Sequence, residues 1–288
     1  MMECGIHMNK IAILIDSGTD VPQEYVEKYG MYMLSLNIQY EDACYRDRVD
    51  ITPQEVMDRL ETEIPKTSLP SPAETQALLK KIYDDGFRQV IAVTISSGLS
   101  GTNNMLRLMA EECEQDMNIR VIDTKNIGIG AGVTAIRAAE LAAEGRTLDE
   151  IVEALNAMIP NTRVFFCVDT LKYLQKGGRI GLVTAKVGTL LGIRPIISCN
   201  DEGIYYTVQK ARGVKAALTG ALDQVVKAAE GFKKVRLLVA HAGAEERARL
   251  MAEELGKRIK GEIIFAPVSP ALVVHTGPGL LGVGVQCE

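Results

Sequence analysis

Apolar runs of strand length alternate with segments of helical periodicity along almost the whole chain, and this alternation constrains the fold more than any other feature. The run Ile11 to Asp16 ends in the polar turn Asp-Ser-Gly-Thr-Asp, and a helical pattern over Val21 to Tyr29 follows it. Continuous apolar strands separated by helices are typical of a parallel sheet that is covered on both faces. We therefore predict an α/β fold that opens with a mostly parallel, doubly wound sheet.

The same order continues to about Pro160. Thr52 is a predicted N-cap and Pro53 a first helical residue, because these residue types favour those positions. The further expected strands are Met31 to Gln39, Gln89 to Ile95 and Arg120 to Asp123, and the further expected helices are Ile51 to Glu61, Ala73 to Asp84, one from about Thr102 to Asp116, Gly130 to Ala143 and Leu148 to Met158.

Beyond residue 160 the pattern changes. Pro195 to Cys199 and Ile204 to Gln209 flank an Asp-Glu-Gly turn, which predicts an antiparallel hairpin. A chain of 288 residues also exceeds the commonest domain size. We expect an N-terminal α/β domain over residues 1–160, of which 1–9 are an extension, and a C-terminal α/β domain over residues 161–288. The other elements expected there are strands at 164–168, 235–240, 262–266 and 283–286 and helices at 214–229 and 244–260.

Charge and composition exclude several classes of protein. The net charge of −5 and the isoelectric point near 5.5 provide no basic field for a nucleic acid. No apolar run reaches the roughly 18 residues of a membrane span, and Met1 to Lys10 lacks the apolar middle of a signal peptide. Six scattered cysteines without a C-x-x-C motif indicate reduced thiols rather than a zinc site. We expect a soluble cytoplasmic protein without an integral membrane segment.

Two hydroxyl-rich turns could bind a small polar group. In Thr67-Ser68-Leu69-Pro70-Ser71-Pro72, the prolines would preorganise the hydroxyls of Thr67 and Ser68, whereas Ser71 is equally well read as a helix cap. In Ser96-Ser97-Gly98-Leu99-Ser100-Gly101-Thr102, a strand ends and a helix begins, which is where open α/β sheets bind ligands. A capped turn without a ligand is the alternative for the second segment.

Two glycine turns in the C-terminal half complete the candidates. His275 and Thr276 precede a turn containing Gly277, Pro278 and Gly279, and a histidine there could respond to a bound carboxylate or be an ordinary core residue. The segment Leu174 to Ile180 reads most simply as a helix end with Gly177 at C′. Neither G-x-x-x-x-G-K-[ST] nor G-x-S-x-G occurs, so nucleotide binding and a serine nucleophile elbow are unsupported.

Taken together, these motifs resemble those of the DegV family. The resemblance covers nearly the whole chain from Lys10 onward and rests on four ordered segments: Thr67 to Ser71, Ser96 to Thr102, Leu174 to Ile180 and His275 to Gly279. It implies a two-domain α/β fold with a fatty acid, such as palmitate, stearate or oleate, bound between the domains. Similar proteins of Gram-positive bacteria are the acyl-binding subunits of fatty-acid kinase and present the carboxyl group to a separate kinase subunit.

The resemblance also implies roles for particular residues. Thr67 and Ser97 would bind the carboxyl group with His275 close by, and Ser96 is the alternative to Ser97. Ser68, Gly98 and Thr276 belong to the same turns and are expected at the ligand. An arginine in the region of Arg212 would engage the kinase. Aliphatic residues around Ile127 to Ile136 and Leu182 to Leu191 could line the acyl tunnel or be ordinary core.

Two classes of function stay open at this point. The first is a non-catalytic carrier that needs no cofactor, with the fatty acid as its only ligand. The second is an acyl hydrolase or other lipid-processing enzyme that uses Ser97 and His275. The carrier is favoured because the sequence shows neither a nucleophile elbow nor an acidic partner for His275.

Overall fold

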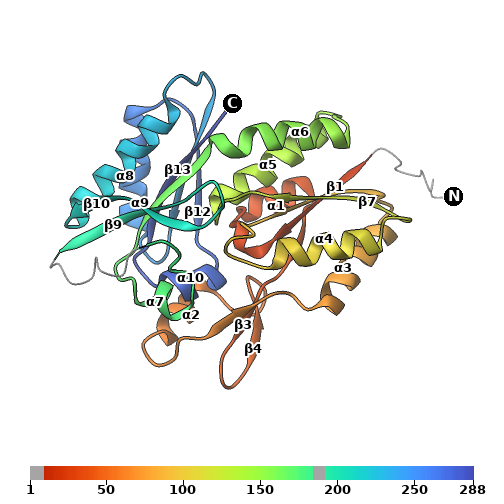
Figure 1. Cartoon of the computed structure of the whole chain (residues 1–288), viewed down its shortest axis with the longest axis horizontal. Coiled ribbons are helices and arrows are strands. Elements are labelled where there is room, and N and C mark those ends of the chain that lie inside the picture. Colours follow the sequence, from red (N-terminus) through yellow and green to blue (C-terminus); the bar gives the residue numbers. More distant parts are fainter. Residues whose placement is uncertain (1–9, 184–191) are drawn as a thin grey trace.

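The computed structural model describes residues 10–183 and 192–288. Two large sheets with their helices lie side by side, and a small third sheet projects below them (Figure 1). The expected extension at residues 1–9 lies outside the described residues. Among the helices of the described ranges, none has the length and apolar character needed to cross a bilayer.

The first large sheet is parallel throughout and has the order β2-β1-β6-β7. Its faces are covered differently: Leu14 of β1 packs in a cluster with residues of α3 and α4, whereas Ile15 packs in a cluster with residues of α5 and α6. This arrangement confirms the predicted doubly wound parallel sheet. The elements are β1 (Ile11–Asp16), β2 (Tyr32–Leu34), β6 (Gln89–Thr94), β7 (Asn118–Asp123), α3 (Pro72–Asp84), α4 (Thr102–Glu112), α5 (Ile129–Ala143) and α6 (Leu148–Met158).

Capping residues set the helix starts where the sequence predicts them. The side chain of Thr52 accepts a bond from the backbone N–H of Glu55, and Ser71 does the same for Glu74. In both cases the glutamate bonds back to the cap residue, which completes a capping box. The helices concerned are α2 (Pro53–Arg59) and α3, and the remaining helices of this half are α1 (Gln23–Tyr29) and the 3-10 turns η1 (Ser17–Thr19) and η2 (Ile159–Asn161).

The expected single strand from Met31 to Gln39 is wrong. The chain leaves the parallel sheet after Leu34, and the backbone N–H of Leu36 donates to the Ser17 hydroxyl instead of to a strand. It then enters a separate antiparallel sheet of order β4-β3-β5, built from β3 (Asn37–Gln39), β4 (Cys44–Arg46) and β5 (Lys66–Ser68). Thr67 and Ser68, which were expected in a connecting loop, therefore lie on a strand that is paired with β3.

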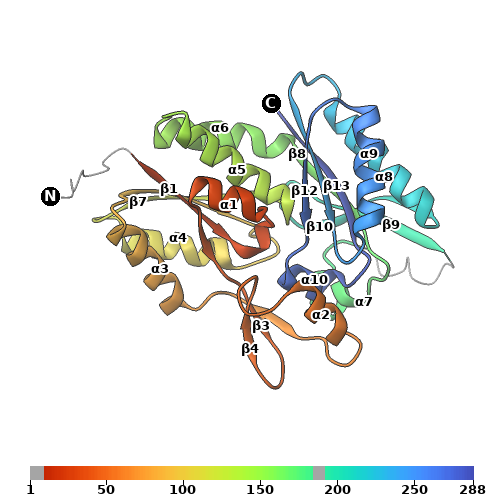
Figure 2. The ribbon, with the colours of Figure 1, turned by 180° about the vertical axis from the view of Figure 1, so that it is seen from behind.

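The second large sheet has six strands in the order β10-β9-β8-β13-β11-β12. All neighbours are antiparallel except β11 and β12, and β9 and β10 form the predicted hairpin. Helices α8 and α9 lie on its outer side (Figure 2). The elements are β8 (Thr162–Cys167), β9 (Ile193–Cys199), β10 (Tyr205–Arg212), β11 (Val235–His241), β12 (Glu262–Pro267), β13 (Leu281–Cys287), α7 (Lys172–Lys176), α8 (Val214–Ala229), α9 (Glu245–Arg258) and α10 (Pro270–Thr276).

Helix α5 joins the two halves and is buried on nearly all sides. A Cβ atom at Gly130 would lie 2.4 Å from a methyl group of Val164 in β8, and one at Gly132 would lie 2.3 Å from the carbonyl oxygen of Thr19. Glycine is therefore needed at both positions. The largest buried apolar cluster contains residues of both large sheets. Because this core is shared, the packing does not test the expected domain boundary at residue 160, which stays a prediction.

Candidate functional site

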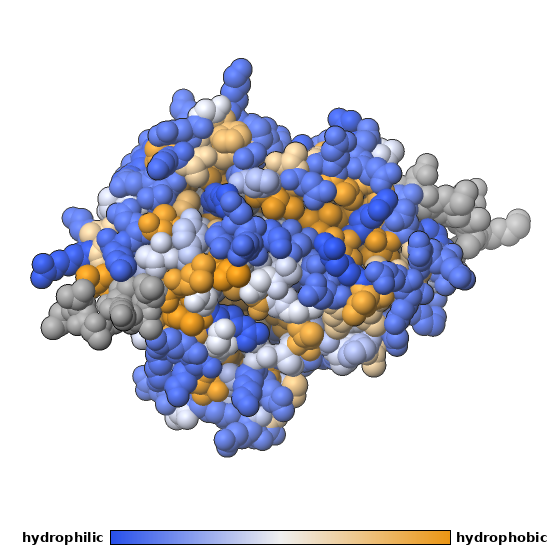
Figure 3. All heavy atoms as spheres, in the orientation of Figure 1, coloured by the Kyte–Doolittle hydropathy of each residue, from blue (hydrophilic) through white to orange (hydrophobic). Residues whose placement is uncertain are grey.

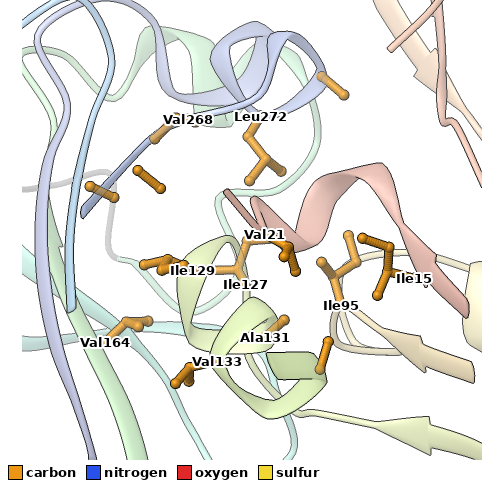
Figure 4. Packing of buried hydrophobic residues seen from close by; sticks show 14 of the residues in the cluster. Ile15, Val21, Ile95, Ile127, Ile129, Ala131, Val133, Val164, Val268 and Leu272 are labelled. Atoms are coloured by element: carbon orange, nitrogen blue, oxygen red, sulfur yellow. The ribbon is translucent and has the colours of Figure 1, made fainter. Parts of the chain in front are cut away.

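An apolar cavity lies where residues of the two large sheets and the small sheet meet. Its volume is about 260 Å³, against the roughly 10–15 Å³ that one water molecule needs. Figure 4 shows part of its wall: Val268 and Leu272 lie on one side, and Ile127 and Ile129 on another. The apolar lining residues are Leu36, Leu69, Ile95, Leu99, Ile127, Ile129, Val164, Phe166, Ala240, Val268, Ala271, Leu272, Leu280 and Val283.

One leucine of the cavity wall is also exposed to solvent. Leu69 lines the cavity and is 39% exposed, so its side chain reaches both the cavity and the surface. Figure 3 shows a mostly hydrophilic surface with patches of hydrophobic side chains near the middle of the face drawn there. Of the expected tunnel residues, Ile127 and Ile129 do line the cavity, while residues 184–191 lie outside the described ranges.

A pair of side chains from distant parts of the chain forms a polar end. The hydroxyl oxygen Oγ1 of Thr67 and the ring nitrogen Nε2 of His275 are 2.7 Å apart, although the residues are 208 positions apart in sequence. Both residues line the cavity, as do their neighbours Ser68 and Thr276. The structure thus brings together four of the residues that were predicted to bind a ligand.

His275 is neutral in this environment. Burial is the main cause, and the charge of Arg179 adds to it; together they lower the pKa of His275 to about 4. The other ring nitrogen, Nδ1, has no hydrogen-bond partner among the described residues. When Nε2 carries the single proton, it donates to Thr67, and the hydroxyl proton of Thr67 is then free for a ligand oxygen.

One packing contact and two hydrogen bonds fix the position of His275. A Cβ atom at Gly177 would lie only 2.0 Å from Nδ1 of His275, so the glycine lets the α7 end approach the ring. Helix α10, which carries His275, is also tied to the N-terminal half, because Asp20 and Asp47 each accept a bond of 2.9 Å from a backbone N–H at its start. Burial raises the pKa of Asp20 to about 7 and that of Asp47 to about 6.

The structure adds polar residues that the sequence analysis missed, among them a serine and an arginine. Ser100 lines the cavity, and so does Arg179, whose guanidinium donates to the carbonyl oxygens of Leu99 at 3.2 Å and Gly177 at 2.8 Å. The expected cap at Gly177 needs correction, because Gly178 has the left-handed backbone with φ of 69° while Gly177 has φ of −79°. The turn places the guanidinium of Arg179 at the cavity wall, near His275. The signal in the sequence was the arginine that directly follows two glycines, which was interpreted only as a helix end.

Ser96, Ser97 and Gly98 are not among the residues that line the cavity. The Ser96 hydroxyl donates to the carbonyl oxygen of Gly203 at 2.9 Å and accepts from the N–H of Gly98 at 3.0 Å. A Cβ atom at Gly98 would lie 2.9 Å from that same carbonyl oxygen. These contacts hold the β6–α4 turn against the β9–β10 hairpin.

Ser97 has a separate set of partners. Its hydroxyl accepts from Nζ of Lys125 at 3.2 Å, and Lys125 also pairs with Asp123 at 2.8 Å. Contacts with the ligand by Ser97, or by Ser96 in its place, stay predictions. Arg212 is the exposed last residue of β10, paired across the hairpin with Ile193, and its role toward a partner also stays a prediction.

In the part of the chain that the structure describes, no three His, Cys, Asp or Glu side chains are grouped so that they could hold a metal ion.

Comparisons with known proteins point to one family. The sequence model described as "Uncharacterised protein, DegV family" matches residues 10–288. A DegV domain-containing protein of Clostridium acetobutylicum is 43% identical over 277 residues, which cover 96% of this chain and 98% of that protein. A solved structure from Thermus thermophilus, described by its fatty-acid binding, has a TM-score of 0.89 at 30% identity and covers 97% of this chain and 100% of that one.

One further neighbour is described with a particular acid. It is a stearic acid-binding protein of Eubacterium ventriosum, with a TM-score of 0.87, 27% identity and coverage of 96% of this chain and 98% of that chain.

Proposed function

Because the chain belongs to the DegV family, we propose that it binds one long-chain fatty acid, such as palmitate, stearate or oleate, in the cavity described above. The carboxyl group lies at the polar end and the acyl chain lies among the aliphatic side chains. The observation that carries this proposal is the Thr67–His275 pair at 2.7 Å on the wall of an otherwise apolar cavity. Solved relatives described by their fatty-acid binding support the same ligand class.

The two parts of the ligand contribute differently. Each methylene of the acyl chain that leaves water contributes up to about 0.8 kcal/mol, so the chain supplies most of the affinity. The carboxylate costs several kcal/mol to desolvate unless it is hydrogen-bonded. Thr67, with its hydroxyl proton freed by His275, is the first donor, and the charge of Arg179 favours the ionised form of the ligand.

We assign the serine contact to Ser100 rather than to Ser97. Ser100 lines the cavity, although its hydroxyl also bonds to that of Thr102, whereas Ser97 does not line the cavity and its hydroxyl accepts from Lys125. The contact of His275 with Thr67 favours a carrier over a hydrolase, because a hydrolase would need the imidazole of His275 as the base for Ser97. In this proposal the protein is a non-catalytic, cytoplasmic carrier that needs no cofactor and presents the carboxyl group to a separate fatty-acid kinase subunit, with Arg212 at the contact between them.

Denaturing mass spectrometry of lipid extracted from the purified protein tests the proposed function. We expect one free fatty acid per chain. The proposal is wrong if no acid is found and if added palmitate, stearate and oleate all fail to bind.

A further inference from the structure

Strand β13 has glycine at its first two positions on the face that is turned toward the cavity. The larger side chains of this strand pack on the other face, in the cluster that contains residues of α8 and α9; they are Leu281, Val283 and Val285. Because side chains alternate along a strand, Gly282 and Gly284 belong to the inner face. Phe166 and Ala240, which flank Gly282 in the sheet, line the cavity together with it.

The missing side chain at Gly282 leaves space in the cavity wall. A Cβ atom there would lie 3.5 Å from the Cβ atom of Phe166 and 3.9 Å from that of Ala240. Among the described residues, and apart from its two chain neighbours, no atom outside β8 and β11 would be closer. The protein could therefore accept a side chain at this position, and its absence enlarges the cavity. Phe166, Gly282 and Ala240 form the open row.

The next row of the same face is closed. A Cβ atom at Gly284 would lie 3.1 Å from a methyl group of Val164 and 3.3 Å from one of Leu238, its neighbours in the sheet. The same methyl group of Val164 would lie 2.4 Å from a Cβ atom at Gly130 of α5. Val164 therefore fills the space between β13 and α5, and it is the member of this closed row that lines the cavity.

The open row lies away from the polar end. Val268, which precedes α10, and His275, near the end of that helix, both line the cavity. The N–H of Val268 donates to the carbonyl oxygen of His241 at 2.9 Å, and Ala240 is the preceding residue of β11. The start of α10 is therefore beside the open row, and the closed row follows one step farther along the strands.

We propose that the open row holds the terminal methyl group of the acyl chain, and that Gly282 and Val164 together set the chain length that the protein prefers. This proposal rests on the proposed function, since it places the carboxyl group at the polar end. A chain that ends over Gly282 has all its methylenes buried. A longer chain meets Val164 and must bend back or leave methylenes in water. Each buried methylene strengthens binding roughly fourfold, so the acid that just reaches Val164 binds most tightly.

Competition binding on the full, delipidated chain tests this proposal. Displacement of cis-parinaric acid is measured with laurate, myristate, palmitate, stearate and arachidate. Gly282→Val fills the open row with methyl groups, so the affinity of stearate relative to laurate should fall roughly tenfold. Val164→Ala removes the methyl groups that lie between Gly284 and Gly130, so the affinity of arachidate relative to stearate should rise by roughly fourfold or more.

A smaller change and two controls sharpen the test. Gly282→Ala should lower the ratio of stearate to laurate roughly fourfold. Gly256→Ala is its control, because a Cβ atom there would also lie 3.5 Å from its nearest neighbour, a methyl group of Ile263, and Gly256 does not line the cavity. Val239→Ala is the control for Val164→Ala, because Val239 is a fully buried strand valine in the cluster on the outer face. Both controls should keep the wild-type ratios.

The outcomes separate the chain-length device from the proposed function. If the wild type binds none of the five acids, the fatty-acid carrier itself is wrong. If it binds them and both Gly282→Val and Val164→Ala keep the wild-type ratios, the carrier stands and the role of the two rows is wrong. An equal loss for all five acids in a folded Gly282→Val variant would also contradict a position at the chain end. If urea unfolding shows that Gly282→Val is not folded, Gly282→Ala and Val164→Ala decide by the same criteria.

Discussion

The hydroxyl-bearing segments at residues 67–71 and 96–102 meet different surroundings in the fold. In the first, Thr67 faces the cavity and contacts His275, which is neutral. In the second, Ser97 contacts Lys125, which is paired with Asp123, and Ser96 holds the hairpin through Gly203. Only the third serine of that segment, Ser100, lines the cavity. A hydroxyl near a strand end is therefore no sign of ligand contact until its neighbours are known.

The largest expected effect follows from breaking the first of these environments. Thr67→Val removes the hydroxyl donor and leaves the His275 ring unpaired at Nε2, so fatty-acid affinity should fall by about 3 kcal/mol, roughly a hundredfold. Displacement of a fluorescent fatty acid measures this loss. Thr62→Val is the control, because the Thr62 hydroxyl bonds only to a nearby carbonyl in an exposed turn. Equal affinities of the two variants would remove Thr67 from the site.

The neutral His275 gives the second prediction. Its folded pKa of about 4 lies below the usual 6.5, so the unfolded chain binds the proton more readily, and the contribution of His275 to stability is lost as the pH falls from about 6.5 toward 4. At pH 5 the loss is about 2 kcal/mol relative to pH 7.5.

Urea unfolding of the wild type and His275→Gln at both pH values isolates this effect. The variant should lose about 2 kcal/mol less than the wild type between pH 7.5 and pH 5. The comparison is needed because Asp16, Asp20 and Asp47 have pKa values raised to about 7, 7 and 6 by burial and change stability in the opposite direction over this range. An identical pH dependence in both proteins would contradict a buried neutral histidine.

The third prediction separates the two serines of the second segment. Ser100→Ala should weaken fatty-acid binding by about 1.5 kcal/mol, the value of a hydrogen bond to a charged group. Ser97→Ala should change it by less than about 0.5 kcal/mol, as expected away from the ligand. Affinities from the same displacement assay decide between them, and a larger loss in Ser97→Ala would return the carboxyl contact to Ser97.

Ser96 should affect stability more than affinity. Ser96→Ala leaves the Gly203 carbonyl and the Gly98 N–H without their shared partner, so the free energy of unfolding should fall by about 1 kcal/mol. The affinity for stearate should stay within about 0.3 kcal/mol of the wild type. Unfolding by urea and displacement binding on the same sample test both statements, and a loss of binding without a loss of stability would place Ser96 at the ligand.

The smallest effect on ligand binding is expected for Arg212. Arg212→Ala should retain the fatty acid content of the wild type, because Arg212 is exposed and does not line the cavity. Acyl-phosphate formation with the cognate kinase subunit should fall. Lys215→Ala, which changes an exposed cation just beyond the same strand, is the control. Unimpaired phosphorylation in Arg212→Ala across carrier concentrations would exclude Arg212 from the contact.

Local patterns predicted much of the fold. The N-caps Thr52 and Ser71 and the β9–β10 hairpin depend on residues that are near one another in sequence. The parallel sheet was predicted from its apolar strands, although its pairings join distant residues such as Ile11 and Gln89. The break after Leu34 could not be predicted, because the alternation of side chains continues through it. After the break, the backbone N–H of Leu36 donates to the hydroxyl of Ser17, nineteen residues earlier.

The sequence by itself determined the α/β class, the apolar character of the interior and the segments from which the site is built. Tertiary structure alone decided which side chains of those segments face the cavity. Lys125 donates to the hydroxyl of Ser97, and the hydroxyl of Ser96 donates to Gly203. The glycine turn after α7 and the β9–β10 hairpin bring Arg179 and Tyr205 to the cavity wall. Periodicity indicates which face of an element is buried. The hydrogen-bond partner of a buried hydroxyl depends on long-range contacts that no local pattern contains.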